Sequence, residues 1–301
     1  MAVLAVQQIR AMRGGAQSQL MLGSDENLWV VKFQNNPQHT RVLANEYLAT
    51  RLAASVGLTV PACDVVEVTE WLIANTPELL IQLPAGQVPR GRERCRAGLH
   101  FGSRFVGGLM PGQVVDTLPE MQLAEVKNLR EFAGMLVMDK WTSNVNGRQA
   151  VFGKRPRERR YTATFIDQGY CFNAGEWKLI DTPLRGVFVS NLVYERVVGW
   201  ESFEPWLGRV EGMDPQTIWS AAESIPPEWY GRDTAELEQL VEALIARRAR
   251  VRELIDGFRE SHRLPFPHWG RPASEVVPAI FAEPFPKGEW NAKTGAGKLV
   301  M

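Results

Sequence analysis

The sequence predicts an α+β fold in which an antiparallel sheet near the N-terminus precedes a mainly helical C-terminal part. Short apolar runs separated by glycine or polar turns fill much of the first hundred residues, as is typical of strands. Longer segments with apolar residues at helical spacing dominate the later chain. A length of 301 residues with 45% hydrophobic content suits one two-lobed domain or two smaller ones.

Three apolar runs near the N-terminus predict strands, at Val3–Ile9, Gln19–Leu22 and Leu28–Phe33. Between the first two lies the glycine pair Gly14-Gly15. Glycines here would let backbone N–H groups approach phosphate oxygens closely, although a plain hairpin turn is the alternative interpretation.

Lys32 lies in the third apolar run, where a buried ammonium group needs a partner. Residues 41–56 carry apolar side chains at helical spacing and predict a helix that ends at Gly57. Glu46 lies in this helix, and a strand Lys paired with a helix Glu holds the nucleotide phosphates in protein kinases. The alternative places Lys32 on an edge strand and Glu46 on a solvated helix face.

A fourth strand is predicted at Cys63–Val68, and a fifth at 99–106 that runs into the glycine pair Gly107-Gly108. In a kinase, the adenine would meet backbone groups at this point, between the two halves of the molecule. An ordinary strand followed by a turn is the alternative. The candidate nucleotide contacts in this strand are Phe101, Ser103 and Phe105.

The next segments predict one helix and one hairpin. Thr117 and Glu120 form a capping box, and the apolar stripe that follows predicts a single helix to about Met138. Residues 149–152 and 161–166 predict a hairpin. Its tip, 154–160, is strongly basic, and we expect a solvated turn there, with contact to an acidic protein, a lipid head group or RNA as the alternative.

Asp139, Asn144 and Asp167 form the most informative pattern in the chain. Phosphoryl transfer needs one carboxylate to accept a hydroxyl proton, and an amide oxygen and a second carboxylate to hold magnesium. Kinases place the first two groups on one loop and the third just past the next hairpin, which is the order found here. Taken alone, the three residues could equally form a cap, a turn and a hairpin corner.

The remaining chain predicts a helical core and an extended tail. Asp233 and Glu236 predict a helix start, and the helix should continue to about Phe258. From Pro265 the sequence is rich in proline and glycine, so we expect an extended tail. The aromatic residues expected in the helical core are Trp200, Phe203, Trp206, Trp219 and Trp229.

Composition excludes several other function classes. The formal net charge is zero, so we expect no nucleic-acid partner. No run approaches the ~20 apolar residues of a membrane span, and the first ten residues do not resemble a signal peptide. Three widely spaced cysteines and four histidines predict neither disulfides nor a structural metal site, which favours a cytoplasmic protein.

In this order of features, the chain resembles the HipA-like kinases, a bacterial branch of the protein-kinase superfamily. The resemblance covers about residues 7–172, and less specifically the helical segments to about 263. Asp139 to Asn144, together with Asp167, match the family's catalytic and metal positions. The other matching segments are Gly15-Ala16-Gln17 (nucleotide loop), Asn45–Ala49 (Asn-Glu helix) and Gly57–Pro61 (Gly-Leu-x-x-Pro exit).

The chain departs from kinase patterns at three places. Val137-Met138 replace the His-Arg pair before the catalytic Asp, so control by a phosphorylated activation loop is not implied. Gln168 replaces the Phe of Asp-Phe-Gly, and Gln19 stands where the HipA pattern has Lys, which removes a possible phosphate contact. The Asp139–Asn144 and Asp167 motifs are also similar to those of phosphatidylinositol kinases and aminoglycoside phosphotransferases.

The resemblance implies a two-lobed protein-kinase-like fold and three segments. These are an N-lobe at 1–98, a hinge and helical C-lobe at 99–264, and a tail at 265–301. It also implies an ATP-dependent phosphotransferase that acts on a hydroxyl acceptor, with a protein serine or threonine as the expected substrate. A phosphoinositide or small-molecule kinase, or a kinase-fold binding module without turnover, are the alternatives.

The resemblance also assigns roles to the site residues. Asp139 would accept the hydroxyl proton, and Lys32, held by Glu46, would neutralise the α- and β-phosphates. The metal, Mg²⁺ or Mn²⁺, would be bound by Asn144 and Asp167. The residues expected to cover the phosphates with backbone donors are Gly15, Ala16 and Gln17.

Overall fold

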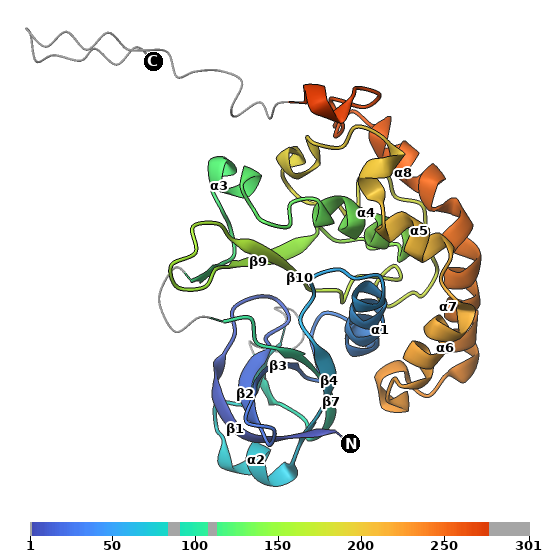
Figure 1. Cartoon of the computed structure of the whole chain (residues 1–301). Coiled ribbons are helices and arrows are strands. Elements are labelled where there is room, and N and C mark those ends of the chain that lie inside the picture. Colours follow the sequence, from blue (N-terminus) through green and yellow to red (C-terminus); the bar gives the residue numbers. More distant parts are fainter. Residues whose placement is uncertain (1, 84–90, 108–112, 277–301) are drawn as a thin grey trace, which may run out of the picture.

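The computed structural model describes residues 2–83, 91–107 and 113–276, and its N-terminal part is a closed five-stranded barrel (Figure 1). The strand order around the barrel is β1-β2-β3-β7-β4. The strands are β1 (Val3–Ala11), β2 (Gln19–Gly23), β3 (Leu28–Lys32), β4 (Cys63–Val68) and β7 (Gly98–Arg104).

Four of the five neighbouring pairs in the barrel are antiparallel, but β1 and β4 run parallel, with Val3 opposite Val66. The expectation of a purely antiparallel sheet is therefore wrong at this pair. The reason is geometric, because strand directions cannot alternate all the way around a ring with an odd number of members. The barrel also contains β7, which begins at Gly98. The expected N-lobe boundary at residue 98 therefore falls at the start of a barrel strand.

Apolar side chains fill the barrel, and Met21, Val31 and Val66 are fully buried in it. A short helix and hairpin, α2 (Glu70–Asn75), β5 (Leu80–Gln82) and β6 (Arg92–Arg94), extend this part of the chain. The side-chain oxygen of Thr69 accepts a hydrogen bond from the Leu72 backbone N–H at 3.2 Å and caps α2.

Helix α1 (Val42–Ser55) connects the barrel to the rest of the molecule (Figure 1). It contacts β7 and β4 of the barrel as well as α6, so most of its side chains are buried. The helix ends at Ser55 with Val56 as its C-cap, and Gly57 has a φ of +83°. This left-handed residue confirms the predicted C-terminal glycine of the helix.

The later chain is mainly helical, with one three-stranded sheet of order β10-β9-β8. Its strands are β8 (Val114–Val115), β9 (Gln149–Gly153) and β10 (Thr162–Ile166). The helices are α3 (Glu120–Ala124), α4 (Glu131–Trp141), α5 (Trp206–Glu211), α6 (Pro215–Glu223), α7 (Thr234–Arg247) and α8 (Val251–Arg259). Short 3₁₀ turns lie at Asn191–Tyr194, Trp200–Phe203, Pro227–Tyr230, Arg248–Arg250 and Ala273–Glu275.

The single helix expected from Thr117 to Met138 is instead two helices, α3 and α4. Asn128 lies in the break and exchanges two hydrogen bonds with the backbone of Ala163 on β10, at 2.8 and 2.9 Å. These bonds tie the break to the sheet. Because α4 continues to Trp141, Asp139 lies in the last turn of the helix and not in the loop after it.

Two other boundaries also differ from expectation. The helix that Asp233 caps ends at Arg247, and a 3₁₀ turn separates it from α8. The segment after Pro265 begins as a packed element, because Phe266 is buried and its ring centroid lies 5.7 Å from that of Phe203. Residues 277–301, which make up most of the expected tail, lie outside the described residues.

Candidate functional site

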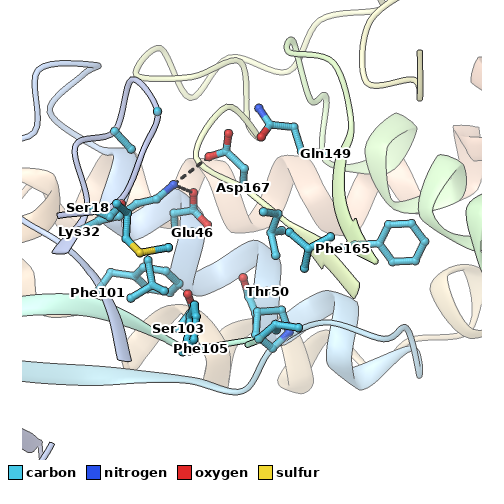
Figure 2. Close-up of a pocket in the computed structure, with 18 of the residues that line it drawn as sticks. Ser18, Lys32, Glu46, Thr50, Phe101, Ser103, Phe105, Gln149, Phe165 and Asp167 are labelled. Carbon is cyan, nitrogen blue, oxygen red and sulfur yellow. Dashed lines mark hydrogen bonds and ion pairs between the residues drawn. The ribbon is translucent and has the colours of Figure 1, made fainter. Parts of the chain in front are cut away.

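A cavity of about 410 Å³ lies where the barrel, α1 and the β9–β10 hairpin meet (Figure 2). The glycine turn between β1 and β2 contributes Gly14, Gly15 and Ala16 to its wall. The strand β3 contributes Lys32, α1 contributes Glu46 and Thr50, and β7 with the residues after it contributes Phe101, Ser103, Arg104, Phe105 and Val106. The side toward the helices contributes Asn146, Gln149, Val151, Phe165, Ile166, Asp167 and Tyr170.

Lys32 joins the barrel to the helical side of this cavity. Its Nζ donates to Glu46 Oε1 and to Asp167 Oδ1, the latter at 2.8 Å (Figure 2). The Lys32 side chain is only 10% exposed, and that of Glu46 is 3% exposed. The expected ion pair between Lys32 and Glu46 is therefore present, and Asp167, which lies 135 positions along the chain from Lys32, completes a triad.

Glu46 also fixes the turn that carries Asp167. Its carboxylate accepts hydrogen bonds from the backbone N–H groups of Gln168 at 3.0 Å and Gly169 at 2.9 Å. A Cβ atom on Gly169 would lie 2.6 Å from a methyl carbon of Val42, so only glycine fits this close approach. Asp167 itself has a φ of +62°, in the left-handed region that Asp and Asn adopt more readily than other non-glycine residues.

Lys32 attracts both carboxylates of the triad, but burial and the neighbouring Asp167 charge together raise the pKa of Glu46 above its ordinary value. Burial disfavours the charged form of Lys32, but the carboxylates of Glu46 and Asp167 outweigh it and raise the pKa of the Lys32 ammonium. Burial likewise disfavours the Asp167 carboxylate, yet Lys32 holds its pKa below the ordinary value. Lys32 therefore stays cationic and Asp167 anionic at neutral pH, as contact with phosphate and with a metal ion requires.

The glycine turn, residues 14–17, lines the cavity on one side and is bonded to β5 on the other. Gly14 has a φ of +118°, and the carbonyl of Ala16 accepts a hydrogen bond from Asn36 Nδ2 at 2.9 Å. Gln17 does not line the cavity: its amide exchanges two hydrogen bonds with the backbone of Gln82 on β5, at 2.7 and 2.8 Å. Of the three residues expected to cover phosphates, Gly15 and Ala16 lie on the wall and Gln17 anchors the turn from behind.

The strand β7 brings Phe101 and Ser103 to the cavity, and Phe105 follows directly after it on the same wall. The backbone N–H groups of Arg104 and Phe105, however, donate to Ala62 and Leu28 within the barrel. These two backbone donors are therefore occupied.

Asp139 and Asn144 do not line this cavity. The Asp139 side chain is 1% exposed, and both of its oxygens accept hydrogen bonds from Arg148, from Nε at 3.0 Å and from Nη2. Asn144 Nδ2 donates to Asp139 Oδ1 at 2.8 Å, and Asn144 Oδ1 accepts from the Asn146 backbone N–H at 3.0 Å. The side-chain polar atoms of the predicted catalytic residue and of the predicted metal ligand are thus occupied by hydrogen bonds to Arg148, to each other and to the loop backbone.

Sequence reasoning missed Arg148, which is buried and joins the two groups of site residues. Burial disfavours its charge, but the adjacent Asp139 raises the pKa of the guanidinium. Its Nη1 also donates to the carbonyl of Ile166 at 2.9 Å, immediately before Asp167. A charged residue directly before the apolar strand β9 was the available signal, because burial there demands a carboxylate partner.

Asn146 and Gln149 occupy the cavity wall near Asp167 instead. Gln149 is paired with Ile166 in the β9–β10 register, which places it beside the turn that carries Asp167 (Figure 2). Among the described residues, no group of three or more His, Cys, Asp or Glu side chains could hold a metal. One carboxylate with nucleotide phosphates, water and amide oxygens is nevertheless a common Mg²⁺ environment, so Asp167 fits such an ion.

The described helices include none that is both long and apolar enough to cross a membrane.

A comparison with curated proteins finds no match. Among solved structures, the chain is similar to Fam20 from hydra, determined with a sugar, at 9% identity and a TM-score of 0.53 over 88% of this chain and 89% of that one. This likeness shows that the two chains share a mixed α+β fold.

Two further structural relatives are kinases or toxins from bacteria. The Helicobacter pylori proinflammatory kinase CtkA matches 83% of this chain and 99% of its own at 12% identity, with a TM-score of 0.48. HipA from Shewanella oneidensis, solved with HipB and operator DNA, matches 87% of this chain and 68% of its own at 14% identity, with a TM-score of 0.46. A family model of HipA-like kinases matches residues 6–157, just over half of the sequence, and the chain therefore belongs to the HipA-like kinase family.

Proposed function

We propose that the protein binds ATP with a divalent cation in this cavity and transfers the γ-phosphate to a hydroxyl acceptor. The observation that carries the proposal is the buried triad of Lys32, Glu46 and Asp167, which lies at the cavity that the glycine turn also lines. A fixed cation beside a carboxylate that can bind metal is what charge stabilisation of a polyphosphate requires. Membership of the HipA-like kinase family supports the same chemistry.

Several residues of the wall have proposed roles. Lys32, positioned by Glu46, neutralises the α- and β-phosphates, and the backbone of Gly15 and Ala16 covers them. Phe101, Ser103 and Phe105 surround the base. The bound cation, Mg²⁺ or Mn²⁺, would be held by Asp167 with help from the amide oxygens of Asn146 and Gln149, and it would neutralise charge on the phosphates.

Asp139 and Asn144 receive a different role from the one their spacing suggests. We assign them to positioning, because their polar atoms bond to Arg148, to each other and to the loop backbone. We also place the boundary of the nucleotide-binding lobe after β7, near Phe105, since β7 completes the barrel. The described helical part, 113–276, would then supply the acceptor side.

A protein serine or threonine remains the proposed acceptor. The second candidate function, a kinase-fold module that binds nucleotide without efficient turnover, is favoured by one observation: the only carboxylates on the described cavity wall are Glu46 and Asp167, and both bond to Lys32. Incubation with labelled ATP and protein, phosphoinositide or aminoglycoside acceptors separates the possible acceptor classes.

Titration calorimetry with ATP, with and without Mg²⁺, tests the nucleotide site. We expect Mg²⁺-dependent binding by the wild type and at least about tenfold weaker binding by Lys32→Met, a loss of about 1.4 kcal/mol or more. Lys178→Met is the matched control, because Lys178 is exposed and does not line the cavity. Equal affinity of Lys32→Met and the wild type, or no binding by the wild type, would reject the proposed function.

A further inference from the structure

Two polar side chains beside the glycine turn line the cavity, and neither has a bonding partner within the part of the chain that the structure describes. We propose that these residues, Arg13 and Gln38, bind the phosphates that lie beyond the α-phosphate of the nucleotide. This role rests on the proposed nucleotide function, and it adds two residues that set the preference of the same site for a polyphosphate.

The buried triad leaves a need for a further cation. Lys32 Nζ bonds to both Glu46 and Asp167, and Asp167 alone already balances its charge. The triad therefore carries no net positive charge. A triphosphate stays negatively charged even with a divalent cation bound, so a second basic side chain beside it would strengthen binding.

The polar side chains at the end of the turn are already engaged within the barrel. Gln17 bonds to the backbone of Gln82, and Gln19 Oε1 accepts a hydrogen bond from Gln8 Nε2 at 3.2 Å. Gln19 is also buried and does not line the cavity. Arg13, which directly precedes the turn, does line it. The chain thus places a basic residue where the turn begins and only occupied amides where it ends.

Arg13 is the basic residue on the described wall that has no partner. The wall has three such residues, Arg13, Lys32 and Arg104. Lys32 belongs to the triad, while Arg104 donates to Asn27 Oδ1 and lies 3.8 Å from Asp25 Oδ2. The Arg13 side chain is exposed and makes no hydrogen bond or ion pair with any described residue. Its charge and its N–H donors are available to a phosphate, which guanidinium groups bind well.

Gln38 lies next to the same turn. A Cβ atom built on Gly15 would lie 3.8 Å from Gln38 Nε2, and Gln38 Oε1 is buried without a partner among the described residues. Asn36 holds this arrangement: its Oδ1 accepts from the Gln38 backbone N–H at 2.9 Å, and its Nδ2 donates to the Ala16 carbonyl at 2.9 Å. An amide without a fixed partner can turn its N–H donors to a phosphate oxygen without breaking a bond.

The order of strands indicates which phosphates these residues meet. The barrel runs β1-β2-β3-β7, so β3 with Lys32 lies between β7 and the turn that joins β1 to β2. The proposed base contacts Phe101 and Ser103 lie on β7, on one side of Lys32. A nucleotide that extends from β7 past Lys32 therefore brings its later phosphates to the turn, where Arg13 and Gln38 lie.

The test compares ATP, ADP and AMP by titration calorimetry with Mg²⁺. We expect Arg13→Gln to weaken ATP and ADP binding at least about tenfold, the loss typical of a hydrogen bond to a charged group, and to leave AMP binding unchanged. Gln38→Leu should show the same pattern with a smaller loss of about threefold. Arg159→Gln removes an exposed charge outside the cavity and is the matched control, which should bind all three nucleotides like the wild type.

The inference is overturned if Arg13→Gln binds ATP like the wild type, or if it loses AMP affinity as much as ATP affinity, which would mean that Arg13 only supports the turn. Arg13→Lys gives a second test, because it keeps the charge and should bind ATP more tightly than Arg13→Gln. Equal ATP affinities of these two variants would also reject the inference. Absence of ATP binding by the wild type is a separate result, which rejects the proposed function itself.

Discussion

Arg148 and Asp139 form a buried ion pair in which both side chains are 1% exposed. Arg148→Met should destabilise the protein by about 3–5 kcal/mol, because it leaves the Asp139 carboxylate buried without a compensating charge. Urea unfolding measures this loss. The double variant Arg148→Met with Asp139→Leu should recover much of it, since the unpaired charge is then gone.

Arg159→Met serves as the control for this pair, because Arg159 is exposed at the basic hairpin tip and should change the free energy of unfolding by less than about 0.5 kcal/mol. If Arg148→Met lowers the free energy of unfolding by less than about 1 kcal/mol, the ion pair does not hold the loop in place. A direct catalytic role for Asp139 would then be favoured.

His100 gives the barrel a pH-dependent stability. The residue is fully buried, its Nδ1 accepts from the Gln34 backbone N–H at 3.2 Å, and its Nε2 donates to the Arg96 carbonyl at 2.9 Å. Burial lowers the pKa of His100 to about 4 from an ordinary value of 6.5. The imidazole therefore remains neutral in the folded protein while it becomes protonated in the unfolded chain.

Because the folded-state pKa is depressed, the unfolded chain takes up the proton first as the pH falls. The contribution of His100 is present above about pH 6.5 and is lost progressively toward pH 4, for a total of about 3 kcal/mol. Urea unfolding between pH 7 and 4.5 should show this slope, and His100→Gln should flatten it. An equally steep slope in the variant would assign the pH dependence to other groups.

At the scale of single residues, the sequence predicts those contacts that burial of charge demands. Lys32 in an apolar strand required a carboxylate partner, and Glu46 is that partner in the structure. The hydrogen-bond partners of Asp139 could not be predicted in the same way. Its spacing from Asn144 is correct, but the direction of its side chain depends on where α4 ends and on Arg148, nine positions later.

At the scale of elements, the glycine turn depends on β5 for its position. Gln17 has a φ of +47° and bonds twice to the backbone of Gln82. Gln17→Ala removes both bonds and should weaken ATP binding about fivefold, which corresponds to about 1 kcal/mol of lost preorganisation. Titration calorimetry provides the measurement.

Gln82→Ala is the matched control, because it keeps the Gln82 backbone groups that Gln17 contacts. It should bind ATP with the wild-type affinity. If both variants bind ATP like the wild type, the turn does not need its anchor on β5, and the role assigned to Gln17 is incorrect.

The positions of the barrel strands could be predicted from the sequence, whereas the break between α3 and α4 could not. The strands of the barrel follow from short apolar runs, and Cys63–Val68 has the predicted bounds. The break between α3 and α4 was not predictable from the apolar stripe, because it depends on a long-range contact between Asn128 and Ala163. Tertiary hydrogen bonds, and not local preference, set that boundary.

At the scale of the whole molecule, barrel and helical part meet at the cavity, and Lys32 contacts Asp167 across it. A ligand that bridges the two parts should stabilise the folded protein. ATP with Mg²⁺ at about 100 times its dissociation constant should add about 2.7 kcal/mol to the free energy of unfolding. Asp167→Asn should lose the Mg²⁺-dependent share of this gain, as thermal unfolding would show. An undiminished gain in the variant would mean that the cation binds elsewhere.

The arrangement of the whole chain could be predicted only in outline. The barrel, the connecting helix α1 and the helical part appear in the predicted order. Closure of the sheet through the parallel pair β1–β4, however, could not be predicted from the sequence. Closure depends on the number of strands and on their twist, which apolar alternation does not encode.

A crystal structure of the protein with Mg²⁺ and a non-hydrolysable ATP analogue tests the central claim most directly. We predict phosphates beside Lys32 and the turn at 14–16, a cation bound by Asp167, and an intact Arg148–Asp139 pair. A nucleotide outside this cavity, or a cation bound by Asp139 and Asn144 with Arg148 displaced, would contradict the account.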